Sequence, residues 1–134
     1  MKLLLDNNIF NERQLLSKLK KQDSTKIKLF VNSIIYLELG FIYFVRQKWI
    51  LFIKILNDLG IKNINITKDI AENAIKSTML FKDSDKGASY YFRDCLIGST
   101  AEVHDMILVT QNLKDFGWLP KDKLLKPDQL LKTL

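Results

Sequence analysis

Short apolar runs of strand length alternate along this chain with longer segments of helical periodicity. Because parallel strands need long crossover connections, which helices usually provide, this alternation predicts an α/β domain. We expect a central parallel sheet of four to five short strands, flanked by helices in three layers. The expected strands are Lys2–Leu5, Ile27–Val31, Ile61–Ile66 and Met106–Thr110, and the C-terminal part should add a short strand and a helix. The expected helices are Ile9–Lys20, Ile34–Gln47, Trp49–Leu59, Lys68–Leu80 and Ala88–Val103, with a polar loop over Phe81–Gly87.

Residues with capping chemistry mark several of these boundaries. Asn32 and Thr67 stand just before predicted helices, where their side-chain oxygens can accept a backbone N–H. Gly60 follows the helix Trp49–Leu59, at the position where a left-handed residue commonly ends a helix.

Composition and charge narrow the class of protein. The 134 residues predict one domain, and 47% apolar with 27% charged residues is typical of a globular protein. The formal net charge of +6 fits an anionic partner, although lysines that only keep a protein soluble would give the same value. The single cysteine, Cys95, excludes an internal disulfide and fits a reducing compartment, so we expect a cytoplasmic protein.

No targeting or membrane segment is expected. Asp6 interrupts the N-terminus before an apolar signal region can form. The very apolar stretch Ile34–Leu56 is broken by Glu38, Arg46, Lys48 and Lys54, so it cannot span a membrane.

Acidic residues stand at element boundaries or inside an apolar helix. Asp6 ends the first predicted strand, Asp94 opens an apolar helical stretch, and Asp115 follows the last core strand. Glu38 lies on the stripe formed by Ile34, Phe41 and Val45. Each has an ordinary explanation taken alone: a helix cap for Asp6, a salt bridge for Glu38, a surface position for Asp115. Together, carboxylates on core-facing elements suggest a shared hard cation, since burying an unpaired carboxylate is costly.

Four segments carry the polar and acidic residues of interest, in the order Asp6–Asn8, Asn32–Leu39, Asp94–Ala101 and Leu108–Phe116. These segments resemble the motifs of PIN-domain nucleases, and most closely those of the toxin component of VapBC toxin–antitoxin pairs. The order, spacing and total length all match, so the resemblance covers nearly the whole chain.

This resemblance implies a PIN-like nuclease domain over residues 1–134 that hydrolyses RNA phosphodiesters with Mg²⁺ or Mn²⁺. Carried over by position, Asp6, Glu38 and Asp94 would bind the metal. The fourth position, usually acidic in the family, falls on Asn112; either this residue or Asp115 completes the site. Asn8 and Thr110 are expected to support the geometry of the site. Without a cation, repulsion among three carboxylates should raise at least one of their pKa values.

The resemblance also implies partners: an RNA substrate, a cognate antitoxin and a second copy of the chain. Large apolar side chains are concentrated between Ile34 and Leu56, where they form either a thick core or an exposed interface. A catalytically weak RNA-binding module of the same fold is the main alternative function. A small-molecule phosphohydrolase is disfavoured, because Asn8 stands where such enzymes carry a second Asp after the nucleophile.

Overall fold

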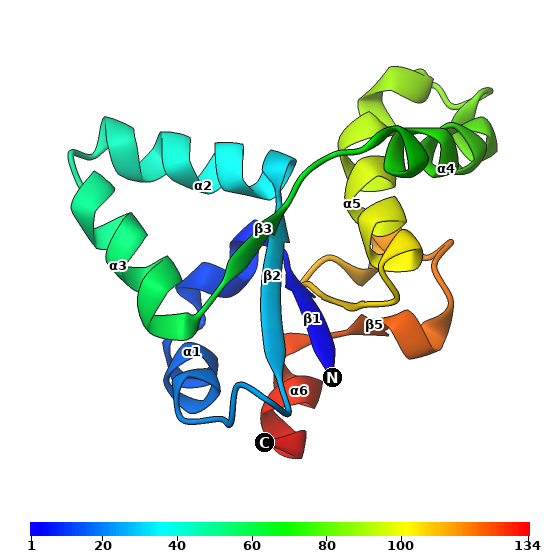
Figure 1. Cartoon of the computed structure of the whole chain (residues 1–134). Helices are drawn as coiled ribbons and strands as arrows, with labels where there is room; N and C mark the ends of the chain where they lie inside the picture. The colour runs from blue at the N-terminus through cyan, green and yellow to red at the C-terminus, as the bar shows by residue number, and fades with distance from the viewer.

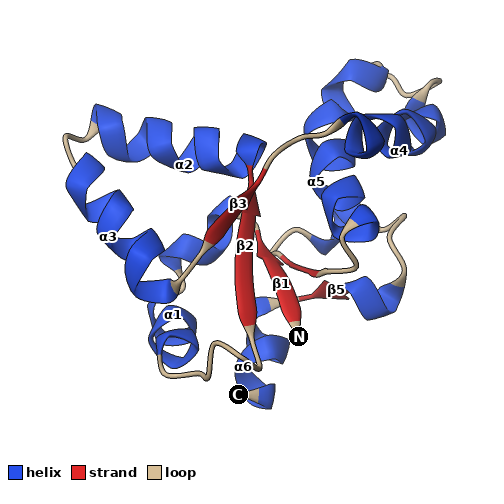
Figure 2. Ribbon diagram, in the orientation of Figure 1, coloured by secondary structure: helices blue, strands red, loops and turns tan.

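The computed structural model describes residues 1–134 and has a five-stranded sheet in which every neighbouring pair is parallel (Figures 1 and 2). The strand order is β3-β2-β1-β4-β5. The predicted central parallel sheet is confirmed. The strands are β1 (Lys2–Leu5), β2 (Lys28–Asn32), β3 (Lys62–Ile64), β4 (Ile107–Val109) and β5 (Leu124–Leu125).

Helices cover both sides of this sheet. In Figure 1, α1 and α3 lie on one side of the sheet, and α4 and α5 lie on the other. The α-helices are α1 (Arg13–Lys20), α2 (Ser33–Val45), α3 (Trp49–Leu59), α4 (Lys68–Thr78), α5 (Phe92–Val103) and α6 (Pro127–Thr133). Short 3₁₀ segments are η1 (Asn7–Asn11), η2 (Met79–Phe81), η3 (Ala88–Tyr91), η4 (Leu113–Phe116) and η5 (Lys121–Lys123). None of these helices combines the length and the apolar character that crossing a membrane requires.

The expected caps are confirmed. Asn32 accepts a hydrogen bond from the Ile35 N–H at 3.0 Å, and Thr67 accepts one from Ile70 at 3.3 Å. Gly60 ends α3 with a φ of 63°, in the left-handed region that glycine occupies without strain.

Several boundaries differ from the sequence prediction. The helix expected over Ala88–Val103 is divided into η3 and α5, which begins at Phe92, and α4 ends at Thr78 rather than Leu80.

Two further differences lie near the N-terminus and at the end of α2. The single helix expected over Ile9–Lys20 is wrong at its start: η1 comes first, and α1 begins at Arg13 after a break at Glu12. Asp6 explains the difference, because its side chain caps η1 by accepting the Asn7 N–H and turns the chain directly after β1. The helix α2 ends at Val45 rather than Gln47, because Gln47 adopts a φ of 57°.

The core lies between the sheet and its helices, and β1 runs through its centre. Leu3, Leu4 and Leu5 are fully buried, as expected for a central strand covered on both faces. Full burial of one such side chain stabilises the fold by roughly 1.5–3 kcal/mol. The largest buried side chains that pack with this strand include Phe52, Ile35, Ile97 and Phe116.

The sheet topology fixes where a site can form. From β1 the chain passes to β2 on one side, and β4 later enters on the other side of β1. The order therefore reverses beside β1, so the carboxyl ends of β1 and β4 form a topological switch point, the place where open α/β sheets commonly bind ligands. Asp6 and Thr110 are the first residues after these two strands.

Candidate acidic site

Three acidic side chains from separate elements converge at the carboxyl edge of the sheet. Asp6 follows β1, Glu38 lies in α2 and Asp94 lies in the first turn of α5. The guanidinium of Arg93 contacts all three carboxylates. Its Nη2 lies 3.0 Å from Asp6 Oδ1 and 2.9 Å from Glu38 Oε1, its Nε lies 2.6 Å from Glu38 Oε2, and its Nη1 lies 2.7 Å from Asp94 Oδ1.

Arg93 is the residue of this site that the sequence did not point out. It is one of 21 basic residues and has no motif of its own. One signal was present: Arg93 stands in the first turn of a helix, where the helix dipole disfavours a cation. An arginine at that position needs an acidic partner, and here it has three.

Asp6 is held rigidly. Its side chain is only 1% exposed, and Oδ1 accepts the Asn7 N–H at 2.8 Å. The Thr110 hydroxyl donates to Oδ2 at 2.7 Å, and the Asn8 amide donates to that same hydroxyl at 3.4 Å. Thr110 therefore contacts the carboxylate that follows β1, and Asn8 contacts Thr110.

Glu38 is positioned by two side chains. Besides the two bonds from Arg93, its Oε1 accepts the Asn7 amide at 3.2 Å. The charge of Glu38 is therefore paired, although its neighbours on α2 are apolar. A salt bridge to Arg93 satisfies the carboxylate in the structure as it stands, which is the ordinary explanation of this residue.

Asn112 and Asp115 lie at the edge of the site, and neither side chain contacts Arg93. Asn112 is exposed and donates its backbone N–H to Thr110 Oγ1 at 3.1 Å. Asp115 is exposed in η4, close enough for its negative charge to raise the pKa of Asp94. That Asn112 or Asp115 completes the acidic site remains a prediction.

Burial and neighbouring charges shift the pKa values of Asp94 and Arg93 in opposite directions. Burial raises the pKa of Asp94 above its ordinary value, and this outweighs the hydrogen bond and charge of Arg93, which lower it. Burial would lower the pKa of Arg93, but the hydrogen bond to Glu38 and the charges of Asp6 and Glu38 raise it above its ordinary value. The expected raised carboxylate pKa is thus found at Asp94, with burial rather than repulsion as its main cause.

The donor set suits a hard cation. All the groups that converge are carboxylates, and they already surround one positive centre, which is the environment that Mg²⁺ or Mn²⁺ favours. In this arrangement no three acidic, His or Cys side chains are grouped to hold an ion directly, and the guanidinium lies among the carboxylates. A metal held by these residues would therefore compete with Arg93 for the same oxygens.

Comparison with known proteins rests on structure alone. No protein-family model matches the chain, and no curated protein matches its sequence. Solved structures match over nearly the whole chain. A toxin–antitoxin complex from Klebsiella pneumoniae aligns with a TM-score of 0.70 and 23% identity, over 93% of this chain and 97% of the other.

Two further structures give the same result. VapBC-1 from nontypeable Haemophilus influenzae aligns with a TM-score of 0.69 and 18% identity, over 96% of this chain and 99% of that one. FitAcB from Neisseria gonorrhoeae aligns with a TM-score of 0.66 and 16% identity, over 93% and 97% of the two chains. The PIN-like α/β fold expected from the four motifs is thereby confirmed, and this chain shares that fold with a chain of each of these three structures.

Proposed function

We propose that this chain is a divalent-metal-dependent endoribonuclease that acts in the cytoplasm as the toxin of a toxin–antitoxin pair. The observation that carries the proposal is the convergence of Asp6, Glu38 and Asp94 on one cationic centre at the carboxyl edge of the sheet. These residues are 32 to 88 positions apart, from 38 − 6 and 94 − 6, so local sequence preferences cannot account for their meeting.

Asp6, Glu38 and Asp94 would hold Mg²⁺ or Mn²⁺. Such an ion, when bound, lowers the pKa of a coordinated water and neutralises charge that develops on a phosphate. The chain supplies orientation: Thr110 and the Asn7 N–H fix both oxygens of Asp6, and the Asn7 amide holds Glu38. No side-chain nucleophile would be required: a water oxygen would form the new bond to phosphorus as the bond from phosphorus to one ribose oxygen breaks, and that oxygen would take up a proton.

An alternative function is favoured by one observation. Arg93 already pairs with all three carboxylates, and the family's fourth acidic position is Asn112 here. A domain of this kind could bind RNA through its net charge of +6 while cleaving it weakly.

Cleavage of RNA separates the two functions. Purified protein is incubated with a pool of single-stranded and structured RNA in Mn²⁺, in Mg²⁺ and in EDTA. We expect cleavage only with metal, and a loss of at least about 100-fold in Asp6→Asn and Asp94→Asn, since each removes charge stabilisation at the reacting phosphate. The matched control is Asp69→Asn, an exposed carboxylate in the first turn of α4.

Binding without cleavage by the wild type would support the RNA-binding alternative. Equal activity in all four proteins, or activity that survives EDTA, would refute the nuclease assignment at this site. Circular dichroism melting shows that the two site variants are folded, which matters because Asp6 is buried.

The surface of α2 and α3 fits a protein partner. Phe41, Phe44 and Ile50 are 66%, 69% and 85% exposed, so part of the apolar segment Ile34–Leu56 forms an exposed surface, while other side chains of the segment belong to the core. We define this apolar hairpin surface by Leu37, Phe41, Phe44, Val45, Trp49 and Ile50. Structures that this fold resembles are complexes of a toxin with its antitoxin. We assign the surface to such contacts, with an antitoxin or a second copy.

A further inference from the structure

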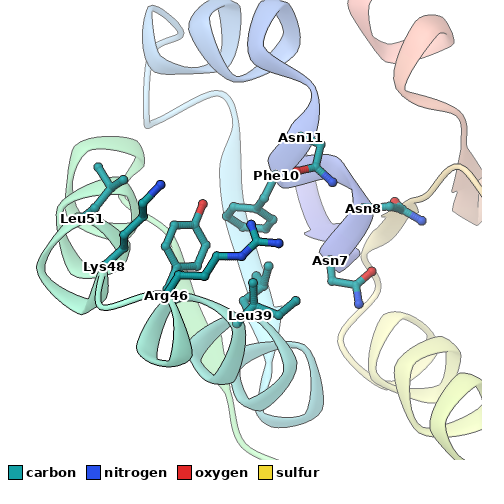
Figure 3. A pocket seen from close by; sticks show the side chains of 10 residues that line it. Asn7, Asn8, Phe10, Asn11, Leu39, Arg46, Lys48 and Leu51 are labelled. Atoms are coloured by element: carbon teal, nitrogen blue, oxygen red, sulfur yellow. The ribbon is translucent and has the colours of Figure 1, made fainter.

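A cavity of about 360 Å³ adjoins the acidic site and is lined by a mixture of charges, amides and aromatic rings. It lies between η1 and the turn that joins α2 to α3 (Figure 3). Its volume lies within the range of about 300–1,000 Å³ that is usual for ligand pockets. Nothing in the metal chemistry of the acidic site uses this space.

Two cations on one wall of the cavity have no partners. Arg46 and Lys48 line it, and neither side chain forms an ion pair or a hydrogen bond. In Figure 3, Arg46 extends from the end of α2 toward Phe10 and Asn7. Gln47 between the two cations has a φ of 57°, a conformation that L residues other than glycine seldom adopt. Unpaired cations beside a cavity fit an anionic ligand.

The opposite wall consists of residues that also position the carboxylates. The Asn7 amide donates to Glu38 at 3.2 Å, and the Asn8 amide donates to Thr110, the residue that holds Asp6. Asn7 and Asn8 therefore separate the cavity from the acidic site and contact the residues of both. A strand whose phosphodiester lies at the carboxylates would place its neighbouring nucleotide here.

The uncharged groups suit a nucleotide. Asn11 lines the cavity, and its amide, which makes no hydrogen bond within the protein, has donors and an acceptor for a base edge. Tyr43 is half-buried and supplies aromatic surface, on which unpaired bases commonly stack, whereas Phe10 belongs to the core and only its edge borders the cavity. An acidic peptide could use the cations and the amides, but it would leave the ring of Tyr43 without a stacking partner.

We propose that this cavity is the subsite for one nucleotide of a single-stranded RNA, adjacent to the phosphodiester at the acidic site, with Arg46 and Lys48 on its phosphates and Asn11 at the base. This inference rests on the proposed ribonuclease function, since it takes RNA as the substrate. Its test uses binding in EDTA, so that loss of cleavage and loss of the subsite are separate results.

The first experiment measures fluorescence anisotropy of a short labelled single-stranded RNA across a salt series in EDTA. We expect Arg46→Ala/Lys48→Ala to weaken RNA binding at least about tenfold. The slope of log K against log salt should become shallower by about 1.4, because each phosphate that the protein no longer neutralises removes about 0.7 from a single-strand slope. The control is Lys18→Ala/Lys21→Ala, which removes the same charge from the exposed face and end of α1. Equally weakened binding in the two double variants, or unchanged binding in the first, would overturn the subsite.

A second variant tests the cavity itself without changing charge. Asn11→Leu removes the amide that we place at the base without adding a ring on which a base could stack. Because Asn11 is exposed, we expect weaker RNA binding with an unchanged salt slope and an unchanged melting temperature. Unchanged affinity in this variant would show that RNA does not enter the cavity.

Poly-glutamate is the ligand that tests for an acidic peptide. The proposal fails if poly-glutamate binds the wild type more tightly than RNA does and loses affinity in Arg46→Ala/Lys48→Ala. In that case the cavity binds an acidic peptide. If cleavage is absent but the variants behave as expected, the subsite stands and the nuclease assignment alone is lost.

Discussion

At the scale of single residues, Arg93 balances the charge of the acidic site. Its guanidinium makes four hydrogen bonds of 2.6–3.0 Å to the three carboxylates, and it contributes one positive charge against their three negative ones. A divalent ion would bring a higher charge to the same oxygens. Metal and guanidinium are therefore competitors, and removing the arginine should favour the metal.

We predict that Arg93→Gln binds Mn²⁺ roughly tenfold more tightly than the wild type, measured by isothermal titration calorimetry. In EDTA the same variant should lose about 2 kcal/mol of unfolding free energy, since hydrogen bonds to charged groups contribute about 1.5–3 kcal/mol. The expected loss is modest because the Arg93 side chain is 32% exposed, and solvent screens its ion pairs. Added Mn²⁺ should raise the melting temperature more in the variant than in the wild type.

Arg13→Gln is the control for this prediction, because Arg13 is an exposed residue at the start of α1 that forms no salt bridge. If Mn²⁺ binds wild type, Arg93→Gln and Arg13→Gln with one affinity, Arg93 does not compete with the metal.

Some residues of this site could be predicted from the sequence more easily than others. Asp6, Glu38 and Asp94 could be predicted, because each interrupts or ends an apolar segment in which a carboxylate is unexpected. Arg93 could not be predicted with the same ease, since its neighbours along the chain do not show that α2 and β1 bring two more carboxylates to it. Long-range pairings of this kind depend on the packing of whole elements.

At the scale of elements, α5 packs closely against the segment that follows β4. Gly98 allows this approach: a Cβ at this position would lie 2.6 Å from Cζ2 of Trp118 and closer still to Cη2 of the same ring. Trp118 follows η4, the segment that carries Asp115. A larger residue at Gly98 would therefore displace the ring and disturb the chain that leads from the acidic site.

We predict that Gly98→Ala lowers the unfolding free energy by about 1–3 kcal/mol, the usual cost of overpacking a filled interior. Chemical denaturation followed by tryptophan fluorescence measures the change. Gly117→Ala is the matched control, because its Cβ would meet only the Lys114 carbonyl at 3.6 Å, an ordinary contact. Equal stability of Gly98→Ala and the wild type would show that Trp118 moves aside freely.

Small residues such as Gly98 could be expected from the sequence to let α5 pack closely, but nothing in the sequence names Trp118 as the neighbour. The sequence pattern also merges η1 with α1, because Ile9 and Leu16, seven positions apart, both pack on the core and keep a helical spacing across the break. Hydrophobic periodicity cannot reveal a single non-helical residue such as Glu12, which lies between η1 and α1. The cap that Asp6 provides is the local signal that decides this boundary.

At the scale of the whole molecule, two features stand together: a basic net charge of +6 and an apolar hairpin surface on α2 and α3. Covering apolar surface contributes roughly 25 cal/mol per Å² before the cost of association. The parallel topology was predictable from the alternation of elements. The exposure of this surface was not, because α2 is apolar on nearly every face and the pattern alone gives no outward side.

We predict that the purified protein dimerises through the apolar hairpin surface at micromolar concentration. Phe44→Glu/Ile50→Glu should give monomers in sedimentation equilibrium with an unchanged melting temperature, since both side chains are mostly exposed. Ile75→Glu, at a 64% exposed position on α4, is the control and should remain dimeric. A wild type that is monomeric at high micromolar concentration, or an Ile75→Glu variant that dissociates, would contradict this assignment.

The hydrogen bond between Thr110 and Asp6 has a consequence for the timing of synthesis. The two residues are 104 positions apart, and β4, which brings Thr110 beside Asp6, is the fourth of five strands to leave the ribosome. A growing chain therefore displays Asp6 early but cannot assemble the acidic site until most of its length has been translated. For a protein proposed to cut RNA, this order of assembly keeps each nascent chain harmless to the message and the ribosome that are producing it.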